Sequence, residues 1–195
     1  MNLPRGDAEA RRAVILDAAL RVFGQYGFRR TSMDDIAREA GIGKGTIYLS
    51  FTSKDEVFQA LSEALSERML AGAEAASRGA GSTAERLAAM SAAWFGTYVE
   101  TIWRSPHAAD LMDAKHRLVA GLVTQAAGRY KQLVRGVLAS AADSGELDLE
   151  GAGLTADTAA ELLIAAGRGL ESSTDVPGDY QRYLDALVRV MVAGL

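Results

Sequence analysis

Glycines around one lysine form the first segment of this sequence that could bind phosphate. The run GIGKGT occupies residues 41–46, and a lysine with glycine backbone amides can cradle phosphate oxygens. A P-loop would need glycine at Arg38 and a hydroxyl side chain at Gly45, and a dinucleotide-binding fingerprint would need glycine at Thr46. No predicted strand precedes the run. We therefore expect no nucleotide cofactor, and no other cofactor is indicated.

Histidines and carboxylates between residues 107 and 116 could hold a metal ion. On a helix, at ~100° per residue, His107 and His116 face opposite sides and cannot bind one ion together. Asp113 with His116 could still supply two ligands, but solvent-exposed polar residues are the simpler interpretation. The chain has no cysteine, which excludes thiolate zinc sites, and it lacks the His-Glu-x-x-His and Gly-x-Ser-x-Gly motifs. We expect no metal site and no enzyme.

The GIGKGT run lies in a helix-turn-helix pattern. Apolar residues at helical spacing predict a long first helix. Thr31 and Ser32 offer N-cap oxygens for a short second helix, and Gly41 supplies the turn before a short third. The predicted helices cover residues 8–26, 33–40, 44–51 and 53–76. The third helix leaves Lys44, Gly45, Thr46, Tyr48 and Ser50 outward, and these side chains suit a helix end lying in the DNA major groove.

Residues 15–61 read ILDAALRVFGQYGFRRTSMDDIAREAGIGKGTIYLSFTSKDEVFQAL. This run resembles the N-terminal DNA-binding domain of the TetR family of transcriptional regulators. The resemblance implies that the third helix approaches base edges and that neighbouring hydroxyl and cationic side chains contact phosphates. Ser50 departs from the aromatic residue or histidine usual in the family, which puts a backbone contact in question, and Thr52 departs from proline. The predicted DNA-binding residues are Thr31, Ser32, Lys44, Gly45, Thr46, Tyr48, Ser50 and Lys54.

Charge and composition divide the chain. The net charge is −4 overall, but residues 1–55 carry nine basic and seven acidic side chains, so the remainder is acidic. We predict a helix-turn-helix domain over residues 1–55, a connecting helix over 53–76, and a helical effector-binding and dimerisation domain over 77–195. The fold class is all-α. Further helices are expected over residues 83–104, 106–116, 118–144, 155–172 and 178–193.

Aromatic residues cluster in the C-terminal half. Four of them fall within ten residues, from Trp94 to Trp103, and the cluster is either ordinary core or the wall of a cavity for an apolar ligand. By architecture alone, the resemblance implies an effector pocket in the middle helices and a dimer interface on the last two. The candidate pocket residues are Met90, Trp94, Phe95, Tyr98, Trp103, His107 and Tyr130. The candidate dimer residues are Leu162, Ala166, Leu170, Tyr183, Leu187 and Met191.

The resemblance implies a homodimeric regulator of transcription. We expect it to bind a palindromic DNA operator, usually as a repressor, and to be released by a small hydrophobic or aromatic effector. The chain begins without the pattern of a secretory signal and contains no run of about 18 apolar residues, so we expect a cytoplasmic protein with no membrane partner. The alternative is a helical small-molecule carrier or adaptor that does not bind DNA.

Overall fold

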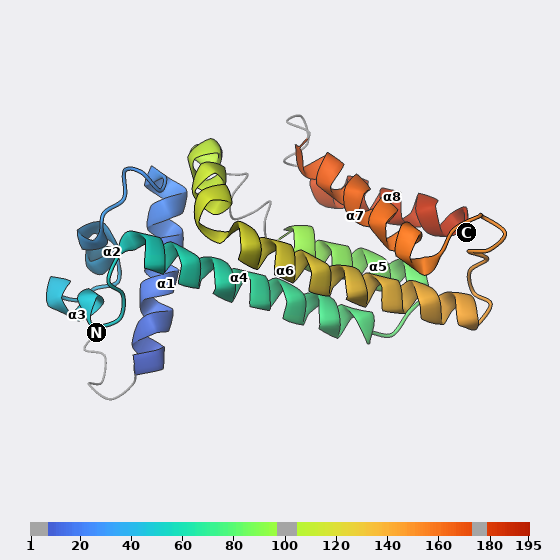
Figure 1. Cartoon of the computed structure of the whole chain (residues 1–195), viewed down its shortest axis with the longest axis horizontal. Helices are drawn as coiled ribbons and strands as arrows, with labels where there is room; N and C mark the ends of the chain where they lie inside the picture. The colour runs from blue at the N-terminus through green and yellow to red at the C-terminus, as the bar shows by residue number, and fades with distance from the viewer. Residues whose placement is uncertain (1–7, 97–104, 173–178) are drawn as a thin grey trace. The chain divides into compact units, whose positions relative to one another are not determined.

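The computed structural model describes residues 8–96, 105–172 and 179–195, and over these residues the chain is helical with no strand (Figure 1). This confirms the predicted all-α class. The elements are α1 (Ala8–Tyr26), α2 (Met33–Glu39), α3 (Lys44–Tyr48), α4 (Lys54–Ser77), α5 (Thr83–Ser91), the π-helical turn η1 (Ala92–Gly96), α6 (Ala108–Asp143), α7 (Ala156–Ser172) and α8 (Tyr180–Ala193).

The residues group into two compact units, to each of which α4 and α6 contribute. The first unit comprises Met1–Leu65 with Thr101–Leu122, and the second comprises Ser66–Glu100 with Val123–Leu195, so far as they are described. The sequence placed the start of α6 in the C-terminal domain, whereas it groups with the first unit. The two helices predicted for this region form one element interrupted at Val119, whose φ of −135° and ψ of 17° are not helical.

The first unit is built around the inner faces of α1, α2 and α3. Here α1 packs against α2, and α2 packs against α3. Ile15, Ile36 and Ile47, one from each helix, are fully buried, which stabilises the fold by about 1.5–3 kcal/mol per side chain. The rings of Phe23, Phe28 and Phe58 lie with centroids 5.1–5.6 Å apart, and they join the α1–α2 loop to α4.

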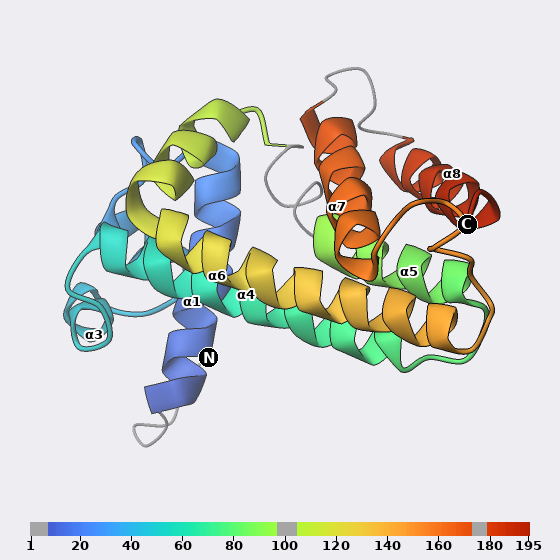
Figure 2. The same ribbon diagram turned by 45° about the vertical axis from the view of Figure 1, so that its right-hand side comes forward.

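The second unit packs α5, η1, α7 and α8 around buried apolar side chains. Helix α8 lies beside both α5 and α7 (Figure 2). Its inner side carries Tyr180, Leu184 and Val188, which are all buried and four residues apart. The Thr83 amide and hydroxyl donate to the Glu146 carboxylate, each at 2.8 Å. These two bonds fix the start of α5 to the segment that follows α6.

Candidate nucleic-acid interface

A capping box begins α2 at Ser32, one of the two residues predicted to offer an N-cap oxygen. The Asp35 amide donates to Ser32 Oγ at 3.2 Å, and the Ser32 amide donates to Asp35 Oδ2 at 2.9 Å. The hydrogen bonds from Ser32 hold the pKa of the Asp35 carboxyl below its ordinary value. Gly41, with φ of +67°, then makes the turn, and a side chain there would be strained. The chain therefore enters α3 in a fixed direction.

Helix α3 presents the side chains predicted to face DNA. Ile47 anchors it in the core, while Lys44 and Gly45 are exposed, Tyr48 is 45% exposed, and Thr46 is half-buried. Lys44 Nζ lies 2.8 Å from Asp34 Oδ2, and that hydrogen bond and the carboxylate charge raise the pKa of Lys44. Both side chains of this pair are more than half exposed, so a phosphate or a base could replace Asp34 as the partner of Lys44.

Two of the residues predicted to contact DNA, Thr31 and Lys54, form hydrogen bonds within the first unit. Thr31 is 3% exposed, and its hydroxyl donates to the Gly27 carbonyl at 2.6 Å. This burial disfavours Thr31 as a phosphate contact, and the neighbouring Ser32, which is exposed, is the better candidate. Lys54 Nζ donates to the Phe28 carbonyl at 2.7 Å and lies 4.4 Å from the Phe28 ring centre. Burial lowers the pKa of the Lys54 amino group. Lys54 therefore fixes the α1–α2 loop to the start of α4.

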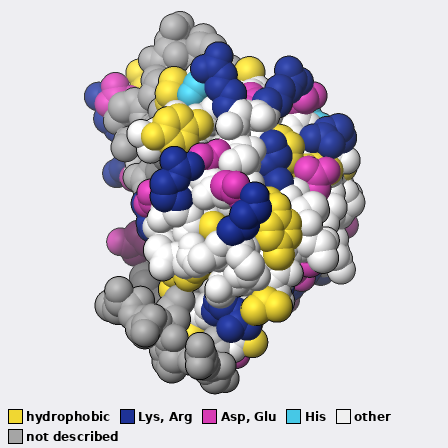
Figure 3. Space-filling model, turned by 90° about the vertical axis from the view of Figure 1, so that its left-hand side faces the viewer, with side chains coloured by type: hydrophobic (Ala, Val, Ile, Leu, Met, Phe, Trp, Pro, Cys, Tyr) yellow, Lys and Arg dark blue, Asp and Glu magenta, His cyan; other side chains and the backbone are white. Residues whose placement is uncertain are grey.

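Ser50 is bound by two arginines that the sequence reasoning missed. Its Oγ accepts a hydrogen bond from Arg11 Nε at 3.0 Å, and its carbonyl accepts one from Arg12 Nη1 at 3.0 Å. The only sequence signal was the excess of basic residues in the first 55. Lys and Arg side chains spread over this face of the first unit, with Asp and Glu side chains between them (Figure 3).

The start of α6 is fixed to the α1–α2 loop. The Arg29 amide donates to Asp110 Oδ2 at 2.9 Å, and Arg29 Nη2 donates to Asp113 Oδ2 at 2.8 Å. Gly27, with φ of +82°, lies against the side chains of His107 and Asp110. His107 belongs to the first unit, whereas the candidate pocket residues Met90, Trp94, Phe95 and Tyr130 belong to the second.

The described candidate pocket residues of the second unit form a packed aromatic group. The Trp94 and Tyr130 rings stack at 4.6 Å, and Phe95 meets Tyr130 edge-on at 6.0 Å. Tyr130 is fully buried beside Ser91 Oγ at 3.3 Å, and burial raises the pKa of its hydroxyl. Met90 is also fully buried. The other two candidates, Tyr98 and Trp103, lie outside the described residues.

The candidate dimer residues lie on the accessible sides of α7 and α8. Leu162 is 52% exposed and Tyr183 is 43% exposed. Ala166, Leu170, Leu187 and Met191 are half-buried. Val190, which was not predicted, is 73% exposed. These accessible apolar side chains lie on two helices that pack against each other.

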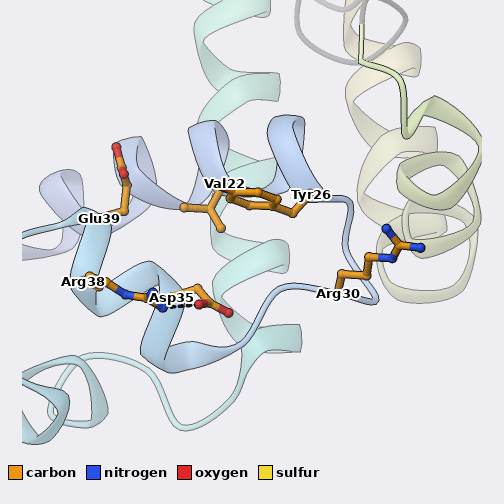
Figure 4. A pocket seen from close by; sticks show the side chains of 6 residues that line it. All are labelled: Val22, Tyr26, Arg30, Asp35, Arg38 and Glu39. Atoms are coloured by element: carbon orange, nitrogen blue, oxygen red, sulfur yellow. Dashed lines mark hydrogen bonds and ion pairs between the residues drawn. The ribbon is translucent and has the colours of Figure 1, made fainter.

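A hollow of about 330 Å³ lies between α1 and α2 (Figure 4). Val22 and Tyr26 line it from α1, and Asp35, Arg38 and Glu39 line it from α2. Its carboxylates are already paired, Asp35 with Arg38 and Glu39 with Arg21. The hollow holds no nucleophile beside a general base. Among the described residues, no group of three or more His, Asp or Glu side chains could hold a metal ion, and no helix is long and apolar enough to cross a bilayer.

Comparisons with known proteins agree with this geometry. Residues 15–61 match the model of the bacterial regulatory proteins of the tetR family. The chain is 44% identical over 61 residues to the HTH-type transcriptional regulator TtgR of Pseudomonas putida, and the match covers 31% of this chain and 29% of TtgR. The match thus spans less than a third of that relative. The family-model match, over residues 15–61, contains all of α2 and α3.

Solved structures extend the likeness of fold to the whole chain. A TetR-like transcriptional regulator from Rhodococcus sp. RHA1 is 26% identical and covers 100% of both chains with a TM-score of 0.66. The FadR regulator from Bacillus subtilis, solved in complex with stearoyl-CoA, is 19% identical with a TM-score of 0.69, covering 94% of this chain and 98% of its own. These relatives are described as regulators, in agreement with the prediction of a protein that is not an enzyme. Residues 15–61 thus match the helix-turn-helix domain of the tetR family of bacterial regulatory proteins, and the fold of the whole chain is similar to that of a TetR-like transcriptional regulator.

Proposed function

We propose that the protein binds a palindromic DNA operator as a homodimer, represses transcription, and is released by a small hydrophobic or aromatic effector. The observation that carries this proposal is α3, whose buried Ile47 turns Lys44, Thr46 and Tyr48 outward immediately after the Gly41 turn. A cation and hydroxyl groups on an exposed helix can donate to base edges and phosphates. Repression rests on the family resemblance.

The homodimer follows from the small size of the recognition element. Helix α3 has five residues and can read only a few base pairs, so a second copy about one DNA turn away, ~34 Å, would supply the other half-site. The accessible apolar side chains of α7 and α8 support such pairing, because Leu162, Tyr183 and Val190 would leave water on association. A two-fold dimer requires a two-fold symmetric operator.

Effector release requires linkage between two states of the dimer. An effector must bind the state with wrongly spaced α3 helices more tightly than the DNA-binding state, and an almost complete shift takes a difference of about 5.5 kcal/mol. The aromatic group of Trp94, Phe95 and Tyr130 would supply an apolar wall for such a ligand. The FadR regulator from Bacillus subtilis was solved in complex with stearoyl-CoA. Its similar fold supports the proposal that this chain binds a ligand with a long apolar part.

The test is selection of operator DNA from random duplexes, followed by titration at fixed salt. We expect an enriched inverted repeat. The variant Lys44→Ala should weaken binding to it by about 1–3 kcal/mol per half-site, because a base or phosphate contact is lost. Lys131→Ala is the matched control, since Lys131 also forms an ion pair, with Glu161 at 2.6 Å, but in the second unit. Equal affinity of both variants would contradict the role of α3, and absence of salt-dependent binding would favour the carrier.

A further inference from the structure

Two arginines of α1 are held beside the end of α3. Arg11 Nε donates to Ser50 Oγ and Arg12 Nη1 donates to the Ser50 carbonyl, each at 3.0 Å. The Arg12 guanidinium also lies 4.2 Å from the centre of the buried Phe51 ring. We call these two residues the arginine pair. A hydrogen bond to Ser50 holds each guanidinium group, and the contact with Phe51 also holds that of Arg12, so less conformational entropy is lost when they bind a ligand.

The arginine pair keeps most of its donors available. Each guanidinium has five N–H groups, and the bond to Ser50 uses one of them. Among the described residues, neither side chain forms an ion pair with a carboxylate. Hydrogen bonds from Thr52 lower the pKa of the Glu56 carboxyl, and the charge of Arg12 helps to lower it. That carboxylate, however, already accepts hydrogen bonds from the Thr52 amide at 2.6 Å and from the Thr52 hydroxyl at 2.9 Å. Among the described residues, neither positive charge therefore has a carboxylate partner at ion-pair distance.

The position of the arginine pair relative to α3 indicates its ligand. Ser50 follows Lys44 by six residues, the last two in a tightened turn beyond α3, which is roughly 9–12 Å at the rises of an α-helix and a 3₁₀ turn. The major groove is about 12 Å wide. With the start of α3 in the groove, the arginine pair falls near the groove edge, where the phosphates lie. Guanidinium groups bind phosphate through paired N–H donors.

We propose that Arg11 and Arg12 bind the phosphate backbone of DNA beside α3 in each half-site. This inference rests on the proposed function. Ser50 acts as the positioning residue, because it fixes both guanidinium groups without contributing charge. These contacts should increase the affinity for every DNA sequence by the same factor, since phosphates carry no base identity.

The test compares Arg11→Gln with Arg11→Lys, and Arg12→Gln with Arg12→Lys, in the full chain. Association with the selected operator and with an unrelated duplex is measured at several salt concentrations. Each Gln variant should bind both duplexes about tenfold more weakly or worse. Its slope of log affinity against log salt should fall by about two per dimer, at roughly 0.9 per phosphate. The Lys variants keep the charge and should keep most of the slope.

Arg21→Gln is the matched control, because Arg21 lies on the same helix, is exposed, and is paired with Glu39 at 2.6 Å. Its salt slope should equal that of the wild type. A purely structural role for the arginine pair predicts that the Gln and Lys variants lose affinity and melting temperature together with an unchanged slope, and that result would overturn the proposal. Suppose that the wild-type protein binds the operator, that Lys44→Ala weakens this binding, and that the Gln variants leave the salt slope unchanged. In that case only the inference about the arginine pair fails. If wild-type protein binds no duplex, the proposed function fails with it.

Discussion

Replacing Gly27 by alanine tests how tightly the start of α6 is packed against the α1–α2 loop. Gly27 has φ of +82°, and a Cβ there would lie 2.6 Å from Asp110 Oδ2 and 3.2 Å from the His107 Cβ. Both atoms belong to a segment whose carboxylates bind Arg29. The methyl group therefore meets a backbone conformation that disfavours it and a contact that has no room for it.

The expected cost combines these two effects. A left-handed conformation costs an L-residue about 1–2 kcal/mol. Displacement of Asp110 would stretch its 2.9 Å bond from the Arg29 amide, and a hydrogen bond to a charged group contributes about 1.5–3 kcal/mol. Because the loop is partly exposed, we take the lower part of the sum and expect Gly27→Ala to reduce the free energy of unfolding by about 2.5–4 kcal/mol. In a chain of this length that lowers the melting temperature by roughly 5–10 °C.

Two other glycines separate the backbone effect from the steric effect. Gly41 has φ of +67° with nothing within 4 Å of the position that a methyl group would take, and Gly24 lies inside α1, also with open space. Gly41→Ala should cost only the backbone term, while Gly24→Ala should be neutral or stabilising by up to about 1 kcal/mol. Thermal and urea unfolding followed by circular dichroism would rank the three variants. A Gly27→Ala variant as stable as Gly41→Ala, or more so, would refute the close packing of Asp110 against Gly27.

Two further predictions concern Lys54 and acid stability. Lys54→Met should lower the free energy of unfolding by about 1–2 kcal/mol, measured by urea unfolding, because the Phe28 carbonyl loses its 2.7 Å partner; unchanged stability would restore Lys54 as a candidate DNA contact. Hydrogen bonds from neighbouring groups lower the pKa of Asp35, Glu56, Glu85 and Glu146 in the folded state. The unfolded chain therefore binds more protons in acid, so this stabilisation is complete above about pH 5 and is lost as the pH falls below about 4. Melting temperatures should fall over that range, and less steeply in Glu85→Gln; a constant melting temperature down to about pH 3.5 would contradict this.

Local signals in the sequence predicted most of the helices. The Ser32 cap and the apolar spacing of α1 gave the bounds of α1 and α2 to within a residue. The third helix was predicted to reach residue 51 but ends at Tyr48. The reason is a tightened last turn, in which the Leu49 amide bonds to Thr46 and the Ser50 amide bonds to Ile47, each three residues back. Periodicity alone does not reveal such a change of hydrogen bonding.

Contacts between distant segments could not be predicted from local patterns. Arg29 and Asp110 are 81 residues apart, and nothing near either residue in the sequence indicates the other. His107 was grouped with Trp94 and Phe95 because it follows the aromatic run closely in the chain. In the structure its amide bonds to Ser105 Oγ at 3.0 Å, and its side chain lies against Gly27. Proximity in sequence was a poor guide because helix α6 returns to the first unit before entering the second.

Ser50 shows how a departure from a family pattern can change the kind of contact rather than remove it. Taken alone, a small hydroxyl in place of a ring predicts a weaker contact with DNA. In the structure that hydroxyl and its carbonyl bind Arg11 and Arg12 from 39 and 38 residues earlier in the chain. A ring contact contributes little to salt dependence, whereas each cation bound to phosphate releases counter-ions. Operator binding by this chain should therefore weaken steeply as salt rises, and Ser50→Ala, which keeps both charges, should lower affinity while leaving that steepness intact.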